Sequence, residues 1–163
     1  MGAGMNLILN YGRAPSHERV YDTKPVSRGR RISLIGAMNN KGIQVAMNIE
    51  GTTNANAFIY FLTHFLCPIL KKGDYVVIDN AAIHKNEEIQ MLIEKSEATL
   101  IFLPPYHPEL NPIELAWNKI KYFLRKWRSR TVDSLYDCYA KALKLITQDN
   151  AQRFFEKTNE FLI

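Results

Sequence analysis

The sequence contains little cysteine, and its cysteines form no disulfide framework. Cys67 and Cys138 are the only cysteines among 163 residues, and they do not form a CxxC pair. A disulfide-stapled secreted scaffold is therefore excluded, and a reducing, cytoplasmic setting is favoured.

Long apolar runs are also absent. The longest, residues 57–70, is interrupted by Thr63, His64 and Pro68, so we expect no bilayer-spanning helix. Residues 1–4 carry no basic segment followed by an apolar one, and no secretory signal is expected. With 47% hydrophobic and 23% charged residues, the composition is that of a globular protein. A length of 163 residues predicts a single domain.

Acidic residues are missing from one stretch, residues 115–130. The rest of the chain has 15 basic and 16 acidic residues, so the whole net charge of +5 comes from this stretch. Such a concentration indicates a polyanionic partner. A solvated helix face with long side chains explains it equally well. The six basic residues are Lys119, Lys121, Arg125, Lys126, Arg128 and Arg130.

Hydrophobic periodicity predicts a mixed α/β fold. Two β-rich runs flank the turn Asn39-Asn40-Lys41-Gly42, which predicts an antiparallel hairpin. Two later runs are continuously apolar, which predicts strands buried on both faces. The expected strands are 31–38, 43–49, 75–78 and 99–103, and the expected helices are 53–70, 85–95, 111–127 and 132–146. The helix from residue 111 is expected to bury Ile113, Trp117, Ile120 and Leu124.

Asp79 directly follows the apolar run 75–78. Open α/β sheets place functional groups at the carboxyl ends of their strands, so this carboxylate is a candidate site residue. The alternative is that Asp79 only forms a turn or caps the next helix.

Glu114 is the second candidate carboxylate. It ends the segment Asn111-Pro112-Ile113-Glu114, a favourable helix start in which Glu114 could reach back to the Asn111 amide as a capping box. In the other interpretation, Glu114 and Asp79 supply oxygen ligands to a hard ion such as Mg²⁺. Local spacing does not decide between the two.

Longer strings around both acids are specific. Asp79 begins DNAAIH (residues 79–84) and Glu114 ends LPPYHPELNPIE (residues 103–114), with 34 residues between the two acids. Together with YGRAP (11–15) and RISLIG (31–36), these strings strongly resemble the catalytic domain of DDE transposases of the mariner superfamily, in its bacterial insertion-sequence branch. The resemblance runs from about residue 3 to residue 126.

This resemblance implies an RNase H-like α/β fold, in which an antiparallel hairpin and parallel strands form a mixed sheet flanked by helices. It also implies Mg²⁺- or Mn²⁺-dependent cleavage and strand transfer of DNA, with Asp79 and Glu114 as catalytic metal ligands. The implied partners are transposon ends, target DNA and a second copy of the chain. Asn80, His84 and Asn111 would lie beside the metal ligands or contact DNA. A packed or surface histidine is the competing interpretation of His84.

The sequence departs from this family at its start. Met1-Gly2 stand where the family has Asp-Glu, the first catalytic carboxylate. Glu18, Asp22 and Glu50 do not occupy the matching position. We therefore expect residues 1–163 to be one catalytic domain without the beginning of its first strand and without the upstream helix-turn-helix domain. Such a chain should be inactive alone.

Two other interpretations stay open. The chain could be a non-enzymatic remnant that binds DNA or dimerises, or an RNase H-like nuclease unrelated to transposition. Cleavage that depends on Mg²⁺ or Mn²⁺ would separate the enzymes from the remnant.

Overall fold

The computed structural model describes residues 1–4, 15–19, 31–129 and 131–159. Within these residues, β1 (Gly2–Gly4), β2 (Arg31–Asn39) and β3 (Gly42–Glu50) form an antiparallel sheet in that order. The strands β4 (Tyr75–Ile78) and β5 (Thr99–Phe102) form a parallel pair. The predicted combination of an antiparallel hairpin with parallel strands is confirmed, although among the described strands the two groups are hydrogen-bonded as separate sheets.

The predicted hairpin is present between β2 and β3. Asn39 pairs with Gly42, and the Lys41 N–H donates to the Asn39 side chain over 2.9 Å. Gly42 has a φ of 122°, a conformation that L side chains rarely adopt, which explains a glycine at this turn. The hairpin carries Ile32, Leu34 and Ile35 into the two cores described below.

The helices follow the predicted order, with differences at their ends. The predicted helix 85–95 begins later, at Glu87, because the Asn86 side chain caps it by accepting the Glu88 N–H. The predicted helix 132–146 ends earlier, and a further helix follows that was not predicted. The observed helices are α1 (Ala55–Phe61), continued by a π-helical turn (Leu62–Leu66) and a 3₁₀ turn (Cys67–Ile69); α2 (Glu87–Lys95); α3 (Pro112–Trp127); α4 (Val132–Lys144); and α5 (Gln148–Asn159), with further 3₁₀ turns at Ala82–His84 and Pro108–Leu110.

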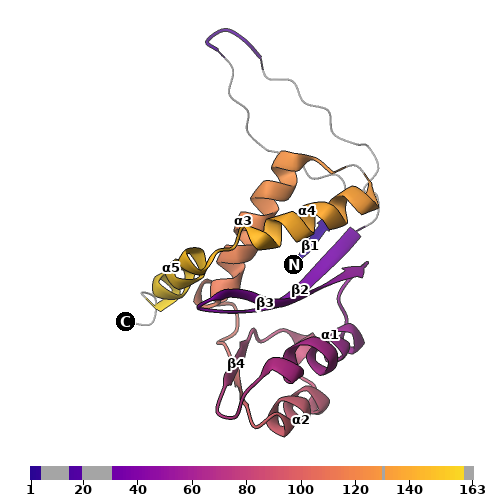
Figure 1. Ribbon diagram of the computed structural model, residues 1–163, viewed down its shortest axis with the longest axis vertical. Helices are drawn as coiled ribbons and strands as arrows, with labels where there is room; N and C mark the ends of the chain where they lie inside the picture. Colours follow the sequence, from indigo (N-terminus) through magenta and orange to yellow (C-terminus); the bar gives the residue numbers. More distant parts are fainter. Residues whose placement is uncertain (5–14, 20–30, 130, 160–163) are drawn as a thin grey trace.

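The β1–β2–β3 sheet lies between two layers (Figure 1). On one side lie α3, α4 and α5, and on the other lie α1, α2 and the β4–β5 pair. Ile32 and Leu34 face the first core and Ile35 faces the second. The first core is completed by Ala116, Trp117, Ile120, Leu124, Leu135, Tyr139, Ala142 and Ile146, and the second by Phe58, Phe61, Leu62, Leu66, Val76, Ile89, Ile93 and Ala98.

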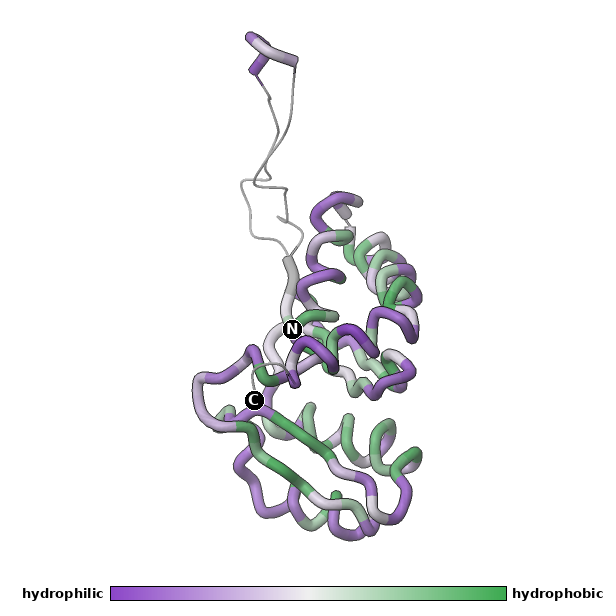
Figure 2. The backbone as a smooth tube through the Cα atoms, turned by 90° about the vertical axis from the view of Figure 1, so that its left-hand side faces the viewer, coloured by the Kyte–Doolittle hydropathy of each residue, from purple (hydrophilic) through white to green (hydrophobic). Residues whose placement is uncertain are grey.

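The prediction that strands 75–78 and 99–103 are buried on both faces is wrong. Val76 is 8% exposed, but Tyr75, Val77 and Ile101 are 70%, 47% and 41% exposed. Among the described strands, β4 and β5 pair only with each other, so one face packs on α1 and α2 and the other carries apolar side chains at the surface. Figure 2 shows this pair as two apolar strands.

Across the described residues, no helix is long and apolar enough to cross a bilayer.

Candidate active site

Asp79 is the first residue after β4, and its side chain is 51% exposed. Its Oδ1 accepts the Ala81 N–H over 3.1 Å and lies 2.7 Å from Nδ1 of His84. The turn predicted as an alternative role of Asp79 is thus present. Among the described residues, both of these contacts end on Oδ1.

His84 lies directly beside Asp79. The 3₁₀ turn Ala82–His84 brings the imidazole back over the end of β4, where Nδ1 also lies 3.3 Å from the Asp79 carbonyl oxygen. The side chain is 14% exposed and packs on Phe58, with 4.3 Å between the ring centroids. Both interpretations of His84 therefore apply. The histidine is packed, and it also lies next to the candidate carboxylate.

Glu114 is the third residue of α3 and is partly buried. The capping-box interpretation requires it to accept the Asn111 N–H, but that N–H donates to the Pro108 carbonyl over 3.1 Å. Asn111 caps the helix alone, with its side-chain oxygen 3.4 Å from the Ile113 nitrogen. The Glu114 carboxylate is therefore not explained by helix capping, whereas the Asn111 side chain is.

The negative charges of both carboxylates affect the pKa of the Met1 amine. Burial lowers the pKa of this amine, while the negative charges of Glu114 and Asp79 oppose that shift. The amine donates to the Leu34 carbonyl over 2.9 Å, which fixes it at the edge of β2.

Two carboxylates from separate elements are suitable ligands for a hard divalent cation such as Mg²⁺. Within the described part of the chain, no group of three or more His, Cys, Asp or Glu side chains could hold an ion. Metal binding by Asp79 and Glu114 therefore stays a prediction from the sequence.

Asn80, next to Asp79, lines a hollow of about 340 Å³ at the carboxyl ends of β4 and β5. Its other lining residues are Lys85, Asn86, Glu87, Gln90 and Phe102. Asn80 therefore borders an open space beside the candidate metal ligand.

The basic helix α3 buries the face that was predicted. Trp117, Ile120 and Leu124 are at most 4% exposed, and Ile113 is partly buried against the same core. Trp127 at its end is 37% exposed and stacks on Phe123, which assigns it to the edge of that core.

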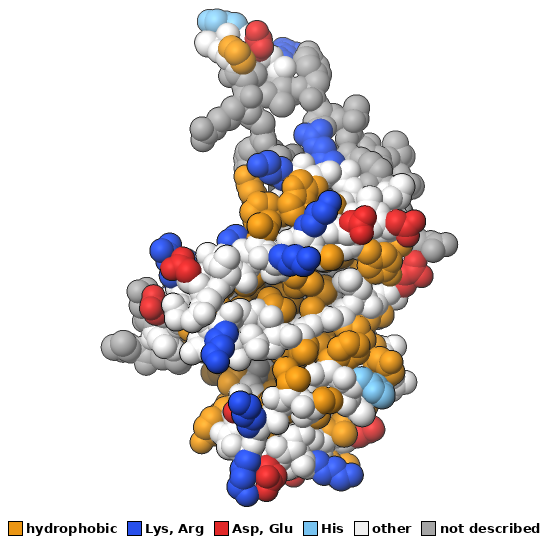
Figure 3. Space-filling view, in the orientation of Figure 1, with side chains coloured by type: hydrophobic (Ala, Val, Ile, Leu, Met, Phe, Trp, Pro, Cys, Tyr) orange, Lys and Arg blue, Asp and Glu red, His pale blue; other side chains and the backbone are white. Residues whose placement is uncertain are grey.

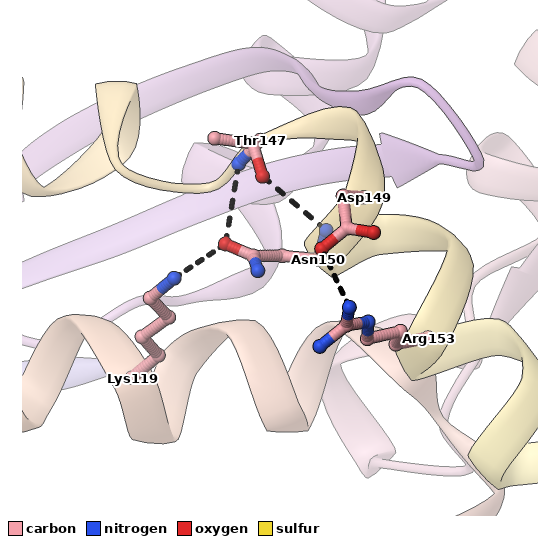
Figure 4. Close-up of polar contacts among 5 residues, drawn as sticks. All are labelled: Lys119, Thr147, Asp149, Asn150 and Arg153. Carbon is pink, nitrogen blue, oxygen red and sulfur yellow. Dashed lines mark hydrogen bonds and ion pairs between the residues drawn. The ribbon is translucent and has the colours of Figure 1, made fainter.

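The basic side chains of residues 115–130 differ in their surroundings. Lys119 reaches α5: its Nζ donates to the Leu145 carbonyl over 3.1 Å and to the Asn150 side chain (Figure 4). Lys126 and Arg128 are exposed, and Lys121 and Arg125 are partly buried. On the face drawn in Figure 3, Lys and Arg side chains stand apart, with other side chains between them. The sixth, Arg130, lies outside the described residues.

Sequence reasoning missed Phe58 as part of this site. It is 26 positions from His84 and belongs to the regular apolar pattern of α1, so no local signal connected it to the imidazole. Only the packing of α1 against the 3₁₀ turn brings the two rings together.

A family model described as DDE superfamily endonuclease matches residues 3–136. The uncharacterized protein y4pE/y4sA of Sinorhizobium fredii is 34% identical over 79 residues, which cover 45% of this chain and 53% of that protein.

Among solved structures, the Mos1 transposase paired-end complex with left transposon end matches 98% of this chain and 50% of that chain, with a TM-score of 0.79 and 14% identity. The Mos1 transposase catalytic domain with raltegravir and Mg matches 81% of this chain and 72% of that one, with a TM-score of 0.67 and 14% identity. These likenesses confirm the predicted RNase H-like fold. The chain spans about half the length of the uncharacterized relative and of the Mos1 chain in the paired-end complex.

Proposed function

The chain belongs to the DDE superfamily endonucleases, and from that membership we propose that it is a transposase catalytic domain for metal-dependent DNA cleavage and strand transfer. The observation that carries this proposal is the family match over residues 3–136, which includes Asp79 and Glu114. The family model supplies the reaction class, and a Mos1 structure is described with a transposon end. We infer that DNA, as transposon ends and target, is the partner, and that a second copy of the chain assembles on it.

In this proposal Asp79 and Glu114 hold Mg²⁺ or Mn²⁺. A bound ion would supply Lewis-acid stabilisation of charge on a phosphodiester. The chain's own contribution is to orient the two carboxylates: the Ala81 N–H and His84 fix Oδ1 of Asp79, and the start of α3 presents Glu114. Asn80, His84 and Asn111 would then lie along the DNA path, with Asn111 acting through the helix start that it caps.

DNA binding would use the exposed side of α3. Lys121, Arg125, Lys126 and Arg128 belong to the helix or its end. Lys126 and Arg128 are exposed, and Lys121 and Arg125 are partly buried. Arg130 and Lys119 complete the set proposed from the sequence, but Lys119 donates to Leu145 and Asn150, so we expect it to stabilise the fold and not to bind DNA. Contacts of this kind go to phosphates and carry no base specificity.

We further propose that residues 1–163 alone cleave DNA poorly. By the resemblance described above, Met1-Gly2 would stand where the family has its first catalytic carboxylate. Two carboxylates balance the charge of one divalent ion, whereas the two-metal arrangement holds two ions about 3.5–4 Å apart. A third carboxylate at residue 1, directly before β1, would supply the missing charge beside a rigid element.

A second candidate is a non-enzymatic DNA-binding or dimerising protein of the same descent. It is favoured by the finding that no group of three candidate metal ligands occurs within the described residues. It predicts DNA binding by the basic side of α3 without cleavage in either metal.

The test is a plasmid-nicking assay with Mg²⁺ and with Mn²⁺. It compares residues 1–163, the same chain with Met1→Asp exposed by removal of a fusion partner, and a chain extended upstream with an Asp-containing first strand. We expect cleavage only from a chain with the added carboxylate, and its loss on Asp79→Ala. Robust cleavage by unmodified residues 1–163, abolished by Asp79→Ala, would contradict the incomplete-site argument. DNA binding without cleavage by every chain would favour the second candidate.

A further inference from the structure

We propose that His84 is a positioning residue for Asp79: its Nδ1–H donates to Oδ1 and thereby reserves Oδ2 for the metal ion. The role of Oδ2 as a metal ligand rests on the proposed function. The hydrogen bond between His84 and Asp79 does not depend on it.

The distances define the bond. Nδ1 lies 2.7 Å from the Asp79 carboxylate and 3.3 Å from the Asp79 carbonyl oxygen, so the carboxylate is the principal acceptor. An ionised carboxylate can only accept hydrogen bonds, and therefore Nδ1 must carry the proton. The geometry thus specifies one form of the imidazole, with hydrogen on Nδ1.

A second donor acts on the same oxygen. The Ala81 N–H lies 3.1 Å from Oδ1, so a side-chain donor and a backbone donor hold one carboxylate oxygen between them. Asp79 is 51% exposed and would otherwise rotate freely. With Oδ1 occupied twice, the rotation of the carboxylate is restricted and Oδ2 becomes the oxygen that a cation meets first.

The imidazole itself is held in place by the core. His84 is 14% exposed, and its ring lies against Phe58, which is 7% exposed and belongs to the core under β4. The His84 N–H donates to the Ala81 carbonyl over 2.9 Å and closes the 3₁₀ turn. Packing against α1 therefore fixes the imidazole, and the imidazole in turn holds the exposed carboxylate of Asp79. Groups that orient a metal ligand in this way typically change metal affinity by about 10–100-fold when they are removed.

A purely structural histidine would need the ring but not the proton. Two variants separate these roles. His84→Phe keeps an aromatic ring on Phe58 and removes the donor, whereas His84→Asn places an amide N–H near the position of Nδ1. His64→Phe is the matched control, because His64 is an exposed histidine that contacts the ring of Tyr60 rather than a carboxylate.

The first measurement is the nitrogen NMR spectrum of the imidazoles in the metal-free wild-type protein. We expect neutral His84 to carry its proton on Nδ1, and to lose this preference in Asp79→Ala. A proton on Nε2 of neutral His84 in the wild type would overturn the inference without any reference to metal.

The second measurement is Mn²⁺ affinity by electron paramagnetic resonance, with thermal unfolding as the check on folding. We expect His84→Phe to weaken binding about 10–100-fold, His84→Asn to restore most of it, and His64→Phe to match the wild type. Wild-type binding that His84→Phe leaves unchanged would overturn the positioning role and leave the proposed function intact. A wild type that binds no Mn²⁺ would overturn both. If His84→Phe fails to fold, the proton position in the wild type decides.

Discussion

Replacing Lys119 by methionine tests whether this residue stabilises the fold or binds DNA. Its Nζ donates to the carbonyl of Leu145, the residue that ends α4, and to Asn150 in the first turn of α5. The Asn150 side chain also accepts the Thr147 N–H over 3.4 Å (Figure 4). One ammonium group therefore joins α3 to the connection between α4 and α5, and methionine keeps the apolar stem while removing that group.

The magnitude follows from the two hydrogen bonds. Bonds to charged groups contribute about 1.5–3 kcal/mol, and the partial exposure of Lys119 reduces this to about 1 kcal/mol. For a domain of this size, 1 kcal/mol lowers the melting temperature by about 2–4 °C. Lys126→Met is the matched control, because Lys126 is an exposed lysine of the same helix, and its change should stay within about 0.5 kcal/mol.

The assay pairs thermal unfolding with the salt dependence of duplex DNA binding. We expect Lys119→Met to melt earlier and to keep the wild-type salt slope. The reasoning would be refuted if the variant melted like the wild type while its salt slope fell by about 0.9, the value for one lost phosphate contact.

Three further outcomes are expected. Gly36→Ala should cost about 1–3 kcal/mol in urea unfolding, because the new Cβ would lie 2.9 Å from the buried Trp117 ring, and an unchanged midpoint would contradict this packing. Burial raises the pKa of Tyr139 to about 12, above its unfolded value of 10.0, so stability should fall as pH rises from 10 towards 12. Tyr139→Phe should remove part of that alkaline loss in urea titrations, and an equal loss in the variant would argue against it. The double change Lys121→Ala with Arg125→Ala should reduce the salt slope of DNA binding by up to about 1.8, and an unchanged slope would exclude this side of α3 as the DNA surface.

Local chemistry made the β2–β3 hairpin and the buried face of α3 predictable. The turn needs a residue that tolerates positive φ, and Gly42 supplies it. In α3, the spacing of Trp117, Ile120 and Leu124 already specifies one apolar stripe, and the structure buries all three. The family strings around Asp79 and Glu114 further predicted the DDE family and the RNase H-like fold.

Other features depend on contacts between distant segments. An apolar run such as residues 75–78 has the same sequence whether one or two faces are covered, so the exposure of Tyr75 and Val77 could not be predicted. The role of Lys119 depends on where α5 docks, and the packing of His84 depends on Phe58 in another helix. Contacts between distant segments such as these produce no periodic pattern in the sequence.

The most direct test of the central claim, that Asp79 and Glu114 share a metal ion, is a Mn²⁺ titration followed by electron paramagnetic resonance. Removing one of two charged oxygen donors should weaken binding at least about tenfold, so we predict this loss for Asp79→Asn and for Glu114→Gln. Glu109→Gln is the control. The Glu109 carboxylate is hydrogen-bonded to His107 in the preceding loop, so its loss should not change Mn²⁺ affinity. Equal Mn²⁺ affinity in the wild type and both site variants would contradict the account.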